Sequence, residues 1–231
     1  MKKMAKVAAL IAAMALAAAA FAQNFPAYLK MDGTKITGCD KASLPANLVI
    51  PKGVTSIGDG AFYDCRSLAS VVIPDSVTGI SDSAFCHCEK LASVTIPASV
   101  TAIGEQAFYG CKSLASVTIP ASVTAIGDGA FYNCKSLASV VISEGVTAIG
   151  EDVFTGCDKL ASVDIPTSVK KIGDAAFLGC DNLKELKYAG TQAQWKKVKK
   201  AGETGLEGKT VVCTDGEATV RTNVLKKLLQ S

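Results

Sequence analysis

Acidic side chains recur in this sequence at a constant spacing of 23 residues. They are Asp59, Asp82, Glu105, Asp128, Glu151 and Asp174. Stacked carboxylates could attract calcium, and a suitably spaced pair could hydrolyse glycosides. Glycoside hydrolysis needs a cleft, however, and a column of acids along an open edge does not supply one. Each acid follows a glycine or a serine at the start of a turn, which favours capping of free backbone N–H groups. We predict capping, and keep hydrolysis through Asp128 as an alternative.

The single histidine, His87, lies between Cys86 and Cys88. A zinc site needs three or four ligands, and Cys88 belongs to a different periodic column. Nucleophilic catalysis would depend on this one histidine alone. We interpret His87 as a loop residue, and predict no catalytic residues, no metal ligands, no cofactor and no enzyme activity.

Two glycine motifs only partly match nucleotide-binding loops. Gly58-Asp59-Gly60 begins like a dinucleotide-binding loop, but Tyr63 stands at the third glycine position. Gly208-Lys209-Thr210 matches the last three residues of a phosphate-binding loop. Glu203, however, occupies the position of the first glycine in that motif. The sequence therefore predicts no nucleotide site.

Six of the nine cysteines occupy one column of the same period. They are Cys65, Cys88, Cys111, Cys134, Cys157 and Cys180. A small apolar residue suits that position, and stacked side chains point the same way rather than at each other. We therefore expect free buried thiols. Cys39, Cys86 and Cys213 lie outside the column and stay candidates for oxidation.

The elements that position these columns come from a repeated unit, V-T-x-I-G-x-x-A-F-x-x-C-x-x-L-x-S-V-x-I-P-x-S, from about Val54 to Leu186. A fixed period of this length predicts a solenoid in which each coil packs on its neighbours. Leu114, Val117 and Ile119 face inward on a short strand, so intervening residues face outward. A second short extended piece, a glycine and a short helical turn complete each coil.

The N-terminal segment predicts export. Residues 1–22 combine three lysines, an alanine-rich apolar run and a small-x-small ending, which is typical of a signal peptide. No other segment is long enough to span a membrane. Removing these lysines from the 24 basic residues leaves 21, equal to the 21 acidic residues. Nucleic-acid binding is not expected from a neutral chain, and we interpret Lys196, Lys197, Lys199 and Lys200 as a solvated surface.

Five segments follow from this reading. After the signal peptide, we predict an N-terminal cap over residues 23–47, the solenoid over 48–187, a degenerate capping coil over 188–214 and a tail over 215–231. One period separates Trp195 from Ile172 and Val211 from Tyr188, which predicts that each pair is aligned. The tail ends in an apolar and basic stretch that indicates a short amphipathic helix.

The unit I-P-x-S-V-T-x-I-G-x-x-A-F-x-x-C-x-x-L, seen cleanly over residues 96–114 and 119–137, resembles the BspA-like, or Treponema pallidum-type, leucine-rich repeats. The resemblance covers roughly residues 44–190. It implies a leucine-rich-repeat solenoid of short parallel strands, capped at both ends. It also implies an exported or surface protein, and for several members adhesion to host or microbial surfaces. It supplies no catalytic motif.

The outward strand residues are the candidate binding site; the alternative is that their uniform serine and threonine reflect duplication of the repeat and carry no site. These residues are Ser70, Val72, Ser93, Thr95, Ser116, Thr118, Ser139, Val141, Ser162, Asp164, Glu185 and Lys187. We expect a non-enzymatic binding protein at the cell surface, secreted or in the periplasm, whose partner is an extracellular or surface protein or a glycan. The alternative is a structural envelope or periplasmic protein that supports assembly without a dedicated ligand.

Overall fold

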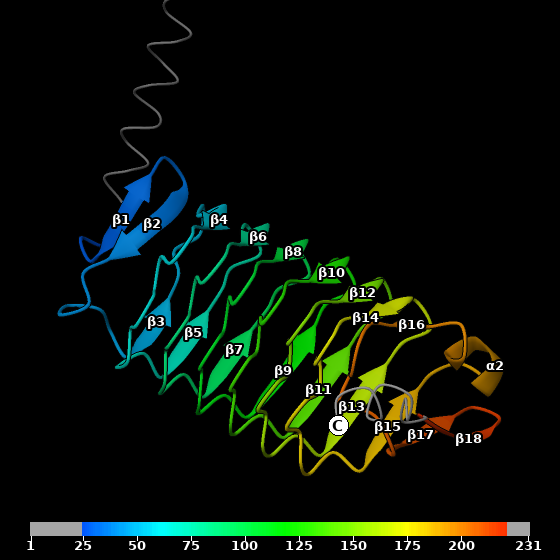
Figure 1. The fold of residues 1–231 in the computed structure, drawn as a ribbon. Helices are drawn as coiled ribbons and strands as arrows, with labels where there is room; N and C mark the ends of the chain where they lie inside the picture. The colour runs from blue at the N-terminus through cyan, green and yellow to red at the C-terminus, as the bar shows by residue number, and fades with distance from the viewer. Residues whose placement is uncertain (1–24, 221–231) are drawn as a thin grey trace, which may run out of the picture.

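The computed structural model describes residues 25–220 and shows a β-solenoid of about eight coils. The coils are stacked in sequence order, from the blue hairpin at one end to the orange and red strands at the other (Figure 1). The predicted signal peptide and the predicted tail helix lie outside the described residues.

One side of each coil contributes a strand to a wide parallel sheet. Its strands are β3 (Asn47–Val49), β5 (Ser70–Val72), β7 (Ser93–Thr95), β9 (Ser116–Ile119), β11 (Ser139–Ile142), β13 (Ser162–Ile165), β15 (Glu185–Tyr188) and β17 (Thr210–Cys213). Equivalent repeat positions pair directly, as Val117 does with Val140. The hydrogen-bonded ladder is divided into a three-stranded part ending at β7 and a six-stranded part beginning at β9. The predicted parallel strands are confirmed.

A second side contributes two-residue strands to a narrow sheet. They are β4 (Ser56–Ile57), β6 (Gly79–Ile80), β8 (Ala102–Ile103), β10 (Ala125–Ile126), β12 (Ala148–Ile149), β14 (Lys171–Ile172) and β16 (Lys199–Lys200). The inward isoleucine of each repeat pairs with the next, as Ile126 does with Ile149. The second extended piece predicted from the repeat is therefore present in every coil.

The third side consists of consecutive turns, and the predicted helical turn is wrong. In the coil that contains Phe108, the N–H groups of Gln106, Phe108 and Gly110 donate to carbonyls of the next coil at 2.8 Å. The N–H groups between them donate within the coil, three residues back. Gln106 and Gly110 have φ values of 55° and 68°, in the left-handed region, and therefore interrupt any helical conformation of this segment. The backbone hydrogen bonds therefore run between coils, which a helix would not allow.

The core is a stack of phenylalanine rings beside a column of thiols. Neighbouring rings, from Phe62 to Phe177, are stacked with centroids 5.1 to 5.7 Å apart. The Cys111 thiol donates to the carbonyl of Phe85 at 3.2 Å, and the Cys134 thiol to that of Phe108 at 3.3 Å. The column cysteines are at most 2% exposed, so the predicted buried column is confirmed.

Glycine precedes five of the six acidic residues, with Ser81 as the exception, and neighbouring coils approach closely at these glycines. Gly104, Gly127, Gly150 and Gly173 have no positive φ, so conformational freedom is not the reason for them. A Cβ on Gly127 would lie 2.6 Å from the carbonyl carbon of Gly104 and 2.7 Å from the nitrogen of Glu105. Both atoms belong to backbone, so neither can move without shifting a coil.

The N-terminal cap is a hairpin of β1 (Leu29–Asp32) and β2 (Lys35–Cys39), and β2 pairs in parallel with β4. It covers the edge of the narrow sheet that would otherwise be open. β3 pairs in parallel with β5, with Leu48 opposite Val71, one period of 23 residues later.

The C-terminal cap departs from the repeat register. Ile172 pairs with Lys200 rather than aligning with Trp195, and Val211 pairs with Leu186 rather than with Tyr188. The reason is an insertion, because helix α2 (Gln192–Trp195) and its flanking turns lengthen the connection. Trp195 is 3% exposed and packs against Tyr188. β18 (Gly216–Thr219), within the predicted tail, pairs antiparallel with β17 and ends the described cap.

Gly127→Ala tests the close approach of the coils. We expect the variant to lower the free energy of unfolding by about 1–3 kcal/mol, because the added methyl group forces neighbouring backbones apart. Gly79→Ala is the matched control, since a Cβ there meets nothing within 4 Å. Urea unfolding measures both. Equal destabilisation by the two variants would contradict the explanation.

The thiol column predicts alkaline destabilisation. Burial raises the pKa of Cys88, Cys134 and Cys180 to about 12, whereas an unfolded thiol titrates near ~8.5. The thiols of the unfolded chain therefore lose their protons at a lower pH than those of the folded chain. Below the unfolded pKa the free energy of unfolding is not affected, and it falls as the pH rises from the unfolded pKa toward the folded pKa. Each thiol contributes a decline of about 1.4 kcal/mol per pH unit over that window.

Cys134→Ala should reduce this slope by the share of one thiol, measured by urea unfolding at several alkaline pH values in the presence of a reductant. Val140→Ala truncates a comparably buried core residue that does not titrate, so it should lower stability and keep the slope. An unchanged slope in Cys134→Ala would show that the column does not govern the alkaline loss.

Candidate binding surface

The outer side of the wide sheet brings the predicted site residues together on one face. Ser116 and Thr118 are exposed, whereas Val117 between them is 3% exposed. The same alternation holds in the other coils, because successive residues of a strand point to opposite sides. Ten of the twelve predicted residues are exposed, and Ser70 and Ser139 are half-buried. We call these twelve residues the outer face.

The outer face changes in character along the stack. At its N-terminal end, Val72 lies opposite Val49, and their exposed fractions are 53% and 63%. Serine and threonine occupy the middle, except at Val141, which is 43% exposed. At the C-terminal end Asp164 lies directly opposite Lys187, and Glu185 is on the same strand as Lys187. A ligand would therefore meet an apolar end, a hydroxyl-lined middle and an end that carries both signs of charge.

A cavity of about 380 Å³ adjoins the charged end. It is lined by Ile142, Glu144, Asp164, Ile165, Pro166, Lys187, Tyr188 and Ala189. Apolar side chains therefore lie beside carboxylates and an ammonium group. This combination can hold the apolar part of a ligand while orienting its polar groups.

The loop after β13 fixes the carboxylate of Glu144. Glu144 accepts hydrogen bonds from the N–H and the hydroxyl of Thr167, at 2.9 and 3.0 Å, and from the N–H of Ser168 at 3.1 Å. Partial desolvation opposes the charge, but these hydrogen bonds outweigh it and lower the pKa of Glu144 below its ordinary value. The rim of the cavity therefore keeps a negative charge at neutral pH.

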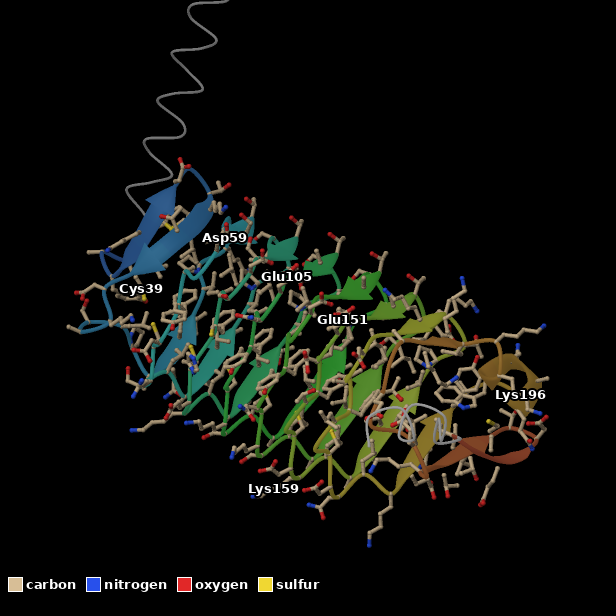
Figure 2. The ribbon with its side chains drawn as sticks, in the orientation of Figure 1. Cys39, Asp59, Glu105, Glu151, Lys159 and Lys196 are labelled. Atoms are coloured by element: carbon tan, nitrogen blue, oxygen red, sulfur yellow. The ribbon has the colours of Figure 1, made fainter. Side chains whose placement is uncertain are left out.

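Three aspartates of the acidic column, Asp82, Asp128 and Asp174, cap backbone N–H groups of the next coil, so the predicted capping is confirmed for these residues but not as part of a helical turn. The carboxylates of Asp82 and Asp128 accept from the N–H groups of Glu105 and Glu151 at 2.7 Å. Figure 2 shows Asp59, Glu105 and Glu151 in a line along one edge of the stack. Within residues 25–220, no group of three or more His, Cys, Asp or Glu side chains is placed to hold a metal ion.

Four rings form an aromatic strip that the repeat pattern alone did not indicate. Tyr63, His87, Tyr109 and Tyr132 follow one another on the turn side, with ring centroids 5.8, 5.2 and 4.8 Å apart. Tyrosine directly after the core phenylalanine was the available signal. In one coil Cys86 replaces the tyrosine that follows the core phenylalanine, and the ring of His87 lies between those of Tyr63 and Tyr109 instead. His87 is thus a packing residue of this strip.

The basic cluster divides into two parts. Lys196, Lys197 and Lys199 are exposed, and Figure 2 shows Lys196 at the C-terminal end of the stack. Lys200 is half-buried, with its Nζ 4.2 Å from the ring centroid of Trp195 and 2.9 Å from the carbonyl oxygen of Val198. Burial lowers the pKa of Lys200. Lys200 therefore helps to close the core, which the sequence pattern did not indicate.

Comparison with known proteins identifies the repeat. The family model described as the BspA type leucine rich repeat region matches in six copies, over residues 40–119 and 79–198. In the part of the chain that the structure describes, no helix has the length and apolarity needed to cross a membrane. A search of curated proteins found no match.

Solved structures share the fold. The T. pallidum leucine-rich repeat protein is 32% identical, with a TM-score of 0.67, over 89% of this chain and 94% of that one. A leucine-rich repeat protein from Bacteroides ovatus is 24% identical, with a TM-score of 0.51, over 83% of this chain and 63% of that one. The pneumococcal vaccine antigen PcpA is 17% identical, with a TM-score of 0.58, over 76% and 45%. The last two likenesses concern the fold alone.

Repeat proteins of this type are generally binding or surface proteins, and they are typically not enzymes. The six matched copies, the 32% identity and the constant register of the coils all agree. The chain belongs to the BspA-type leucine-rich repeat family.

Proposed function

We propose that this chain is an exported, non-enzymatic binding protein that uses the outer face to contact a protein or a glycan outside the cytoplasm. The observation that carries the proposal is the continuity of that face, whose outward side chains run from β5 to β15. Extended solenoid surfaces of this kind suit macromolecules, because one ligand can contact several coils at once.

The regular spacing of the coils favours an extended ligand. Neighbouring strands of a sheet lie about 4.8 Å apart, so equivalent side chains repeat along the face at that interval. Within the paired strands, hydroxyl groups repeat from Ser70 to Ser93 and from Ser116 through Ser139 to Ser162. Each hydroxyl can donate and accept a hydrogen bond, which matches the amides of a peptide or the hydroxyls of a glycan.

The charged end supports a specific orientation of the ligand and opposes nucleic acid. Asp164, Glu185 and Glu144 place negative charges around Lys187. A nucleic-acid surface is expected to neutralise phosphates with clustered basic residues. Mixed charge beside an apolar cavity instead suits a protein or glycan that presents both donors and acceptors.

Export is the compartment part of the proposal, and it depends on the leader pattern of residues 1–22 together with the family's general surface location. Protease digestion of intact cells tests surface exposure. Retention of all of the protein in the cytoplasmic fraction would oppose the proposal.

A ligand is sought by passing the purified protein over immobilised extracellular matrix proteins, mucin and bacterial surface polysaccharide. For any ligand found, Thr118→Trp should weaken binding by about tenfold or more, since a bulky ring in the middle of the face prevents close contact. Thr124→Trp is the matched control, because Thr124 is exposed but precedes a strand of the narrow sheet. Full binding by Thr118→Trp would exclude the outer face.

Lys187→Ala tests the charged end separately. We expect a loss of affinity of roughly 5- to 30-fold, corresponding to about 1–2 kcal/mol, because the variant removes the ammonium group beside the cavity. Lys184→Ala is the control, since Lys184 is exposed and lies just before β15. Surface plasmon resonance measures both. Equal effects of the two substitutions would indicate a non-specific loss of charge.

A further inference from the structure

The hydrogen bonds of the thiol column follow a fixed rule that fails at its first member. Cys88, Cys111, Cys134, Cys157 and Cys180 each donate to the carbonyl of a phenylalanine 26 residues earlier, at 3.1 to 3.3 Å. Twenty-six residues before Cys65, the sequence has Cys39 instead of a phenylalanine. At this first position the Cys65 sulfur lies against the sulfur of Cys39 instead of a backbone carbonyl.

The two sulfur atoms lie close together. Sγ of Cys39 is 3.3 Å from Sγ of Cys65. Cys39 is the last residue of β2 in the cap, and Cys65 belongs to the first full coil. The expectation that Cys39 lies apart from the column is thus wrong, because the hairpin returns it to the head of that column. Figure 2 shows Cys39 on the cap beside the first coil.

The chain segments around the two cysteines are also held together. Lys41 lies two residues after Cys39, and its Nζ is 3.9 Å from Oδ2 of Asp64, the residue before Cys65. The same Nζ lies 5.8 Å from the ring centroid of Tyr63. These exposed contacts contribute little energy, but they show that the two segments lie side by side.

We propose that Cys39 and Cys65 form a disulfide bond that fastens the N-terminal cap to the solenoid. A disulfide has a sulfur–sulfur distance of about 2.05 Å, so the sulfur atoms must approach by about 1.3 Å. The hairpin that carries Cys39 and side-chain rotation can supply a movement of this size. The inference relies on the proposed export only for the oxidising compartment in which the bond would form.

The chemistry is thiol–disulfide exchange with a disulfide oxidant, such as oxidised glutathione or an oxidoreductase disulfide. The Cys39 thiolate attacks one sulfur of the oxidant, forms a mixed disulfide and releases the first thiol. Cys65 then loses its proton and attacks the Cys39 sulfur, which releases the second thiol. Two protein thiols are oxidised and one oxidant disulfide is reduced to two thiols.

The surroundings favour Cys39 as the first nucleophile. The hydrogen bond from the Cys65 thiol lowers the pKa of Cys39; burial opposes this effect, and the charges of Lys41 and Lys30 add to it. Cys39 is half-buried, so an oxidant can reach it, whereas Cys65 is 1% exposed. The hydrogen bond to Cys39 and burial raise the pKa of Cys65, which suits its role as the second, intramolecular nucleophile.

The bond would stabilise the part of the molecule where a stack is weakest. A terminal coil has a neighbour on one side only, so fraying starts there. The link would close the loop from Cys39 to Cys65, which contains β3 and β4. It would therefore restrain the cap and the first coil together.

Peptide mapping decides the pairing. The purified protein is equilibrated with oxidised glutathione, remaining thiols are alkylated under denaturing conditions, and the chain is digested with trypsin without reduction. Residues 36–41 and residues 53–66 form two tryptic peptides that contain one cysteine each. We expect these two peptides to be linked by a disulfide. We also expect oxidation to raise the unfolding temperature by about 5–10 °C.

Cys39→Ser should abolish both the link and the temperature shift, whereas Cys213→Ser should preserve both. The inference is overturned if both cysteines are alkylated, if Cys39 stays joined to glutathione, or if Cys39 pairs with another cysteine. The wild-type map alone gives this answer, so a variant that fails to fold does not matter. The result is independent of ligand binding, and loss of binding in Thr118→Trp would stand whatever the map shows.

Discussion

The structure depends on backbone hydrogen bonds that join each coil to the next on all three of its sides. Two sides use strand ladders, and the third uses turns whose N–H groups alternate between neighbouring coils. Such bonds form only if equivalent residues stay level, so the number of residues per coil is constant through the repeats and changes in the C-terminal cap, where α2 lengthens a connection. The constant spacing of phenylalanines, cysteines and glycines follows from that requirement. Side chains fill the interior, but the hydrogen-bonded main chain sets the distance between neighbouring coils, and the side chains must pack within it.

Most of the fold could be predicted because its information is local and repeated. Inward Val117 and outward Thr118 are distinguished by alternation alone, and the pattern recurs often enough to be unambiguous. The turn side could not be read correctly, because hydrogen bonds between coils compete with those of a helix. Sequence periodicity does not show which set forms. The left-handed conformation of residues such as Gln106 and Asp152 decides it.

The caps and the aromatic strip show a different limit. The period placed Trp195 beside Ile172 and Val211 beside Tyr188. The inserted helix shifts the register, so that Ile172 pairs with Lys200 and Val211 pairs with Leu186. Cys39 looked isolated because a hairpin, rather than a repeat, brings it to Cys65. His87 looked like a lone loop histidine, yet it replaces a missing ring between Tyr63 and Tyr109. In each case the position of the residue depends on tertiary structure that the period of the sequence does not show. Cys39 and His87 occupy positions where the repeating residue is missing from its column. The exposure of the outer face, in contrast, followed directly from strand geometry.

The glycine at the start of each turn segment has a consequence for how such a protein can change in size. Because neighbouring main chains nearly touch at Gly127, an added side chain or a partial insertion at this point of the coil would force the two main chains apart. A duplication of one whole unit, however, would present the same surfaces above and below and leave both ends intact. Length can thus vary in quantised steps, each extending the molecule by about 4.8 Å. Evolution, or an engineer, can in this way match the reach of the stack to a longer or shorter target without redesigning its ends.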